Sequence, residues 1–142
     1  MAIWQFDLYF IHIGSTQPDI RGEEWEAPVI SHALARSVQE VLAHYFGLPW
    51  LMLDDWLVFG PEDGNRVDLL FDDDHAGVSI FVRCDLRDDA PQFFQLVAEL
   101  ARQVDCEFFC SDNAQLISAD LHRLTLAANA RREELVKSRN AI

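Results

Sequence analysis

The stretch Val78-Ser79-Ile80-Phe81-Val82-Arg83-Cys84-Asp85-Leu86-Arg87 decides the fold class of this 142-residue chain. Apolar residues occupy every second position from Val78 to Leu86, and this period of two is typical of a β-strand with one buried face. The opposite face carries Ser79, Phe81, Arg83, Asp85 and Arg87. The pattern predicts a strand over 78–86 in a sheet with one face against a core.

The neighbouring segments extend this strand into a meander. Residues 65–71 and 50–59 predict two further strands, because they are rich in apolar side chains. The stretches 60–64 and 73–77, which connect the three strands, consist largely of turn-forming residues. At the start of the chain, residues 3–13 alternate in the same way and predict another strand.

Two helices are expected between the strands. Residues 31–46 place apolar side chains at helical spacing, with Ser31 as the N-cap and Gly47 at the C-terminal end. A second helix begins after Asp88-Asp89, where one Asp can cap it and Pro91 suits the first turn. The remaining predicted elements are a short strand over 105–110, a brief extended piece at 115–118 and a last helix from near Asp120 to about Lys137.

The order β-α-β-β-β-α-β predicts an α+β fold over a single domain, residues 1–142. We expect a two-layer sandwich of the split βαβ type, with a mainly antiparallel sheet, helices on one face and an additional C-terminal helix. The other sheet face is expected to be open to solvent or to a partner. The residues expected on that open face are Gln5, Asp7, Tyr9, Asp68, Phe81, Arg83, Asp85 and Arg87.

The charge of the chain restricts its partners. It contains 24 acidic and 11 basic side chains, which give a formal net charge of −13. Residues 131–142 hold four basic and two acidic side chains, so the first 130 residues carry −15. Such a surface is poorly suited to a nucleic-acid backbone, which binds Lys and Arg. The ten Phe and four Trp also exclude a disordered acidic tail.

The sequence predicts a cytoplasmic protein. It contains no apolar stretch long enough to span a membrane, and the first residues, 1–5, lack the basic start of a signal peptide. Its three cysteines, Cys84, Cys106 and Cys110, form an odd set without zinc-ligand spacing, which favours buried free thiols. We therefore predict no cofactor.

The segment Glu23-Glu24-Trp25-Glu26 is the first candidate for partner binding. It lies in a long loop, residues 14–29, that contains two Gly and two Pro. Trp supplies contact area and carboxylates pair with Arg or Lys, so the segment suits a basic partner. Alternatively, Trp25 packs back over the core as a lid.

Three further acidic groups are candidates. The turn Asp72-Asp73-Asp74 is either a solvated turn, a partner contact or a site for a hard cation. Asp54 and Asp55 fall within the predicted strand 50–59, where they can protect a sheet edge, contact a partner or serve catalysis. On the open face, Arg83, Asp85 and Arg87 form either an ion-pair ladder with neighbouring-strand carboxylates such as Asp68 or Asp7, or a polar recognition surface. In the second case Asp7, Tyr9, Arg83 and Asp85 are the expected contacts.

Three stretches resemble small acidic bacterial proteins of the toxin-immunity type. They are Trp4-Gln5-Phe6-Asp7, Val82-Arg83-Cys84-Asp85-Leu86-Arg87 and Leu116-Ile117-Ser118-Ala119-Asp120. The resemblance implies a binding role and transfers no catalytic residue.

The expected function is that of a non-enzymatic immunity protein that binds and neutralises a basic toxin. An acidic body steers a cationic partner and disfavours acidic ones. We expect no direct contact with nucleic acid and no membrane association. The alternatives are a carboxylate- or metal-dependent hydrolase that uses Asp54, Asp55 and residues 72–74, a nucleic-acid mimic that binds a basic protein, and a structural homodimer.

Overall fold

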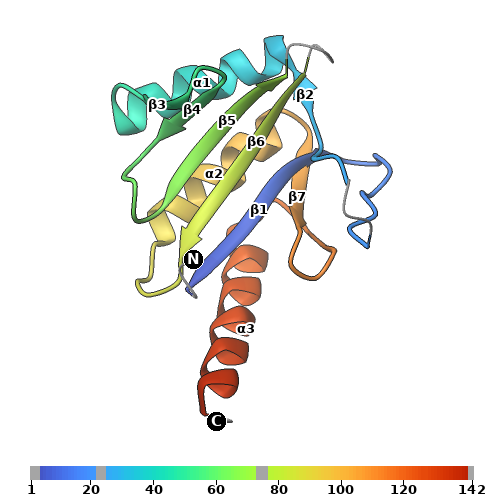
Figure 1. Cartoon of the computed structure of the whole chain (residues 1–142), viewed down its shortest axis with the longest axis vertical. Helices are drawn as coiled ribbons and strands as arrows, with labels where there is room; N and C mark the ends of the chain where they lie inside the picture. Colours follow the sequence, from blue (N-terminus) through green and yellow to red (C-terminus); the bar gives the residue numbers. More distant parts are fainter. Residues whose placement is uncertain (1–3, 22–24, 73–76, 141–142) are drawn as a thin grey trace.

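The computed structural model describes residues 4–21, 25–72 and 77–140 of the chain (Figure 1). Its elements are β1 (Gln5–His12), β2 (Ile30–Ser31), α1 (His32–Phe46), β3 (Trp50–Leu53), β4 (Trp56–Phe59), β5 (Arg66–Asp72), β6 (Gly77–Asp85), α2 (Pro91–Gln103), β7 (Cys106–Cys110), β8 (Gln115–Ile117) and α3 (Leu121–Asn140). This order follows the predicted one closely.

The strands form one antiparallel sheet with the order β3-β4-β5-β6-β1-β7-β8, and β2 pairs with the start of β6. Since β6 lies between β1 and β5 and is antiparallel to both, β1 and β5 run parallel, with α1 in the connection between them. In the same way β1 lies between β6 and β7, which α2 connects. The chain thus contains two split βαβ units, and the predicted α+β class is confirmed.

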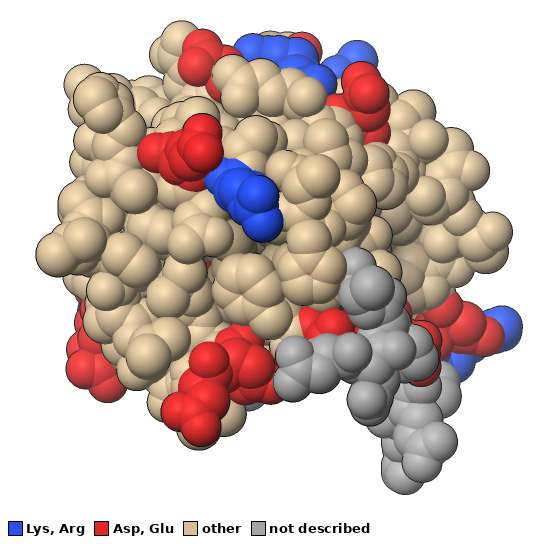
Figure 2. All heavy atoms as spheres, turned by 90° about the horizontal axis from the view of Figure 1, so that it is seen from above, with Lys and Arg blue, Asp and Glu red and all other residues tan. Residues whose placement is uncertain are grey.

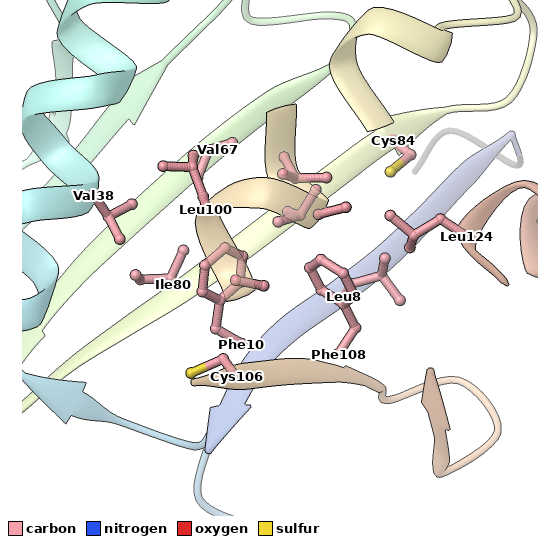
Figure 3. Packing of buried hydrophobic residues seen from close by; sticks show 14 of the residues in the cluster. Leu8, Phe10, Val38, Val67, Ile80, Cys84, Leu100, Cys106, Phe108 and Leu124 are labelled. Carbon is pink, nitrogen blue, oxygen red and sulfur yellow. The ribbon is translucent and has the colours of Figure 1, made fainter. Parts of the chain in front are cut away.

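One face of the sheet carries the hydrophobic core. The inward side chains of the strands and the apolar stripes of α1 and α2 form a single buried cluster, to which α3 also contributes. Figure 3 shows part of this cluster, with Leu8 and Phe10 of β1, Phe108 of β7, Val38 of α1 and Leu100 of α2. Helices α1 and α2 cover this face because each has one apolar side, as the spacing of its residues predicts.

The two ends of α1 are those predicted. The Ser31 hydroxyl accepts a hydrogen bond from the backbone N–H of Leu34 at 3.2 Å, which satisfies one of the free donors of the first turn. At the other end Gly47 has a φ of 85°, a conformation that other residues rarely adopt. Local sequence therefore sets both ends of this helix.

Two details of the prediction are wrong. Residues 50–59 are not one strand but the hairpin β3–β4, in which Leu53 pairs with Trp56 and the exposed Asp54-Asp55 forms the turn. The N-cap of α2 is Ala90, without a side-chain hydrogen bond, and neither Asp88 nor Asp89 caps the helix. The helix begins so late because Pro91 occupies its first position.

The three cysteines are free and buried, as predicted. Cys84 and Cys106 lie in the core cluster (Figure 3). Burial raises the pKa of the Cys106 thiol to about 12 and raises those of Cys84 and Cys110 as well. All three side chains therefore stay protonated near neutral pH and serve as small apolar groups.

The last helix extends away from the sheet (Figure 1). Its buried contacts come from Leu124 and Ala128, which belong to the core cluster. Further along, Arg132 donates from Nε to the carbonyl oxygen of Leu86 at 2.8 Å and pairs with Asp89 at 3.5 Å. Arg132 thus fastens α3 to the connection between β6 and α2. None of the described helices combines the length and apolar character needed to cross a membrane.

Candidate functional site

The candidate site is the sheet face that α1 and α2 do not cover, which we call the helix-free face. In the pairing of β1 with β6, Asp7 lies opposite Arg83 and Tyr9 lies opposite Phe81. On the other edge of β6, Asp68 of β5 also pairs with Phe81. These residues share a face because side chains alternate along each strand. The predicted composition of the face is therefore correct at its centre.

The sequence predicts that this face is open, but the structure shows that its centre is closed. Asp68 has 0 % of its surface exposed and Phe81 only 8 %. Arg66, two residues before Asp68 at the start of β5, is 2 % exposed and is the largest of the fully buried side chains. Both charges therefore lie out of contact with solvent.

Arg66 and Asp68 form a buried ion pair. Arg66 Nε lies 3.1 Å from Asp68 Oδ1, and a second guanidinium nitrogen donates to Asp68 Oδ2 at 3.2 Å. Trp56 Nε1 donates to the same Oδ2 at 2.8 Å, and the guanidinium also lies 5.8 Å from the ring centre of Trp50. Burial raises the pKa of Asp68, and the Trp56 hydrogen bond and Arg66 oppose that rise.

A second, looser pair lies beside the first. Arg83 Nε is 3.7 Å from Asp7 Oδ1, and both side chains are about a quarter exposed, at 27 % and 24 %. Burial raises the pKa of Asp7. Burial also raises the pKa of Tyr9, and the nearby Asp7 carboxylate adds to this rise. Of the predicted ion-pair ladder, the cross-strand pair Arg83–Asp7 is present, whereas Arg87 pairs locally with Asp85.

Trp25 packs on the same face. Its ring meets Tyr9 edge-on at 5.6 Å between ring centres and Phe109 at 6.2 Å. Tyr9 in turn contacts Phe81 at 4.9 Å. Trp25 therefore packs back onto the sheet as the alternative predicts, but on the helix-free face and not over the apolar cluster; it stays half-exposed and its neighbour Glu26 is exposed.

One end of the sheet gathers carboxylates from two loops. The start of β5 lies beside the end of β6, so the β4–β5 loop and the β6–α2 connection meet there. We call this group the acidic end: it consists of Glu62, Asp63, Asp85, Asp88 and Asp89. Arg87 pairs with Asp85 at 2.6 Å, which lowers the pKa of Asp85. The hydrogen bond and charge of Asp85 raise the pKa of Arg87, and the negative charges of Asp88 and Asp63 add to this rise.

Sequence reasoning missed this grouping. Local sequence predicts Glu62-Asp63 in a turn and Asp88-Asp89 at a helix start, as two separate features. The available signal was the antiparallel meander itself, because the loop before one strand lies next to the loop after its neighbour. The sequence contains no comparable signal that Arg66 is buried.

The other predicted groups are separate from this end. Asp72, partly buried, closes β5 at the opposite end of the strand. Glu23, Glu24, Asp73 and Asp74 lie outside the described residues. Within the described part of the chain, no group of three His, Cys, Asp or Glu side chains is placed to hold a metal ion.

One pair could suggest cysteine chemistry. Cys106 Sγ lies 3.8 Å from His12 Nδ1. The thiol is fully buried and its pKa is raised to about 12, so the reactive thiolate is strongly disfavoured. The contact is that of a packed thiol.

Comparison with protein-family models, with curated proteins and with solved structures gives no match to this chain.

Proposed function

We propose that this protein is a non-enzymatic, acidic binding protein of the bacterial immunity type, which binds and neutralises a basic protein toxin in the cytoplasm. The observation that carries the proposal is an imbalance in how the two signs of charge are used. Basic side chains are mostly held by the protein's own carboxylates, whereas many carboxylates are exposed and left for a partner.

The ion pairs document this imbalance. Six of the eleven basic side chains form ion pairs within the described residues: Arg21, Arg66, Arg83, Arg87, Arg131 and Arg132. In that same part of the chain, the exposed carboxylates without an ion pair are Glu26, Glu40, Asp54, Asp55, Glu62, Asp63, Asp88, Glu99, Asp105, Asp120 and Glu133. The outward field is therefore negative, which accelerates association with a cationic protein.

The exposed charge is also unevenly distributed. Figure 2 views the molecule from the end at the top of Figure 1, where α1 lies, and most of this surface is uncharged. Along α1 itself, Arg36 and Glu40 are the only Asp, Glu, Lys or Arg residues. The acidic end lies where β6 points, away from that surface (Figure 1). A localised negative surface favours a defined orientation of a basic partner.

Affinity capture from the native host tests this proposal. The immobilised protein is compared with the variant E62Q/D63N/D88N/D89N at about 0.05 and about 0.5 M NaCl. We expect the wild type to retain a basic protein at low salt, to release most of it at high salt, and the variant to retain much less. The captured protein should be toxic when produced alone in a susceptible bacterium, and co-production of this chain should restore growth.

The matched control is the variant R36Q/E40Q, which removes one charge of each sign from α1 and keeps the net charge. It should capture the partner as well as the wild type does. Capture of an acidic partner, capture that is insensitive to salt, or a basic partner that is not toxic would each contradict the immunity proposal.

A further inference from the structure

The loop between β1 and β2 encloses a hollow of about 400 Å³ that the proposed function does not yet use. Its lining includes His12 at the end of β1, Asp19 in the middle of the loop, and Trp25 and Glu26 near the loop's return to the sheet. Ile11 and Pro28 add apolar wall. The hollow therefore combines an aromatic side chain, apolar surface and carboxylates.

Several contacts hold this loop in place. The backbone N–H of Ile13 donates to the carbonyl oxygen of Asp105 at 3.0 Å, and Gln17 Nε2 donates to the carbonyl oxygen of Ala114. At the other end of the loop, Ile30 pairs with Val78 in the sheet. These contacts, with the ring contacts of Trp25, fix described parts of the loop that border the hollow, which lowers the ordering cost of binding.

Trp25 is fixed in the wall of the hollow by its edge contacts with Tyr9 and Phe109. A ring held in this way is a favourable surface for a cation, which is attracted by the negative face of the indole. Here Glu26 is the next residue and lines the same hollow.

The charged groups around the hollow differ in their availability. Asp19 already pairs with Arg21 at 3.0 Å, which lowers the pKa of Asp19. Glu26 is exposed and forms no ion pair with any described residue. Of the two described carboxylates that line the hollow, Glu26 is therefore the one available to a ligand, within a chain whose net charge of −13 attracts cations.

From these observations we infer that the hollow receives a basic side chain of the partner, with its guanidinium or ammonium group against Trp25 and paired with Glu26. This inference rests on the proposed function, since it assigns a contact to the same basic partner. It adds a second contact region, because the hollow lies at the C-terminal end of β1, next to His12. The acidic end lies at the other end of this strand, where Asp85 pairs with Gln5.

The test uses a small probe and does not need the partner. The ¹⁵N-labelled protein is titrated with N-acetyl-arginine amide while the indole N–H signals of its four tryptophans are recorded by NMR. The variant Trp25→Phe assigns the Trp25 signal. N-acetyl-citrulline amide, of nearly the same shape but without charge, is the control ligand. We expect a saturable shift of the Trp25 signal with the arginine probe and little shift with citrulline.

Two variants separate this contact from general electrostatic attraction. Glu26→Gln should weaken the response of Trp25 several-fold, whereas Glu62→Gln at the acidic end, which removes the same charge, should leave it unchanged. No Trp25 response, an equal response to citrulline, or equal effects of the two variants would overturn the inference. Loss of salt-dependent capture with the Trp25 response intact would instead overturn the proposed function alone.

Discussion

At the centre of the sheet, in β5, the two faces reach the same degree of burial by opposite chemistry. Asp68 and Leu69 are neighbours in β5, point to opposite faces and are both 0 % exposed. Leu69 belongs to the apolar cluster beneath the helices. Asp68 lies on the helix-free face, where Trp56 and Arg66 donate to its Oδ2 and Arg66 Nε lies 3.1 Å from its Oδ1, which accepts no hydrogen bond from the described residues.

The difference follows from what covers each face. The helices bury Leu69 with apolar stripes that tolerate many side chains of suitable volume. On the helix-free face the long side chains of the strands, such as Trp56 and Arg66, supply the cover themselves. Each of their polar atoms needs a partner, so this face is more specific and more sensitive to the loss of one group.

The largest expected effect is that of Asp68→Asn. The substitution keeps the shape and an acceptor for Trp56 but leaves the Arg66 charge buried without a counter-ion. Breaking a buried pair in this way costs about 3–5 kcal/mol. Urea unfolding followed by circular dichroism should show this loss in the free energy of unfolding.

The control for this prediction removes both charges. The double variant R66M/D68L replaces the pair by apolar side chains, and such replacements are often neutral or stabilising. It should recover most of the stability lost in Asp68→Asn. If Asp68→Asn were as stable as the wild type, the contrast between the two faces would not hold.

The apolar face responds to volume. Leu8→Ala, in the centre of the cluster, should cost about 2–5 kcal/mol in the same unfolding measurement, because it removes buried methyl groups and leaves a cavity. Leu51→Ala removes the same atoms from a side chain that is 62 % exposed and should change stability little. Equal losses for the two variants would contradict the assignment of the core to the helix-covered face.

The sequence alone predicts much of this division. The alternation over 78–87 places Arg83 and Val82 on opposite faces, and the structure has them so. The pattern fails at Asp54-Asp55, which interrupts two apolar runs that show no alternation of their own. This polar break is the turn of a tight hairpin, whereas the prediction places it inside one strand.

Burial on the helix-free face could not be predicted for a different reason. Residue parity correctly places Asp68 on the face of Asp7, but its burial depends on Trp56 and Arg66, which come together only through pairing of β4 with β5. The predicted contact residues fare similarly. Trp25 joins Tyr9 through a loop whose path no local pattern specifies.

The aromatic cover of the helix-free face can be tested directly. Trp25→Ala removes the ring that packs on Tyr9 and Phe109, and it should cost about 1–3 kcal/mol, since each aromatic pair contributes roughly 0.5–1.5 kcal/mol. Trp25→Phe retains an aromatic ring and should lose less. If Trp25→Ala unfolds at the same urea concentration as the wild type, then the ring does not stabilise this face.

The smallest expected effect is on the pH dependence of stability. As the pH falls, the contributions of two carboxylates on this face, Asp7 and Asp85, to the free energy of unfolding should change in opposite directions. Burial raises the pKa of Asp7, so between its ordinary value of about 4 and the raised value the native state binds more protons than the unfolded chain. The contribution of Asp7 to the free energy of unfolding should therefore rise as the pH falls through that window. The hydrogen bonds from Arg87 lower the pKa of Asp85, so its contribution is present above about pH 4 and is lost as the pH falls toward the lowered value.

Unfolding measurements from neutral to acidic pH on Asp7→Asn and Asp85→Asn separate these contributions. Relative to Asp7→Asn, the wild type should gain stability as the pH falls toward about 4. Relative to Asp85→Asn, it should lose stability at still lower pH. Two differences of the same sign would mean that desolvation does not control Asp7. The buried centre of the face would then be better solvated than its closed packing implies, and the contrast with the helix-covered face would be correspondingly weaker.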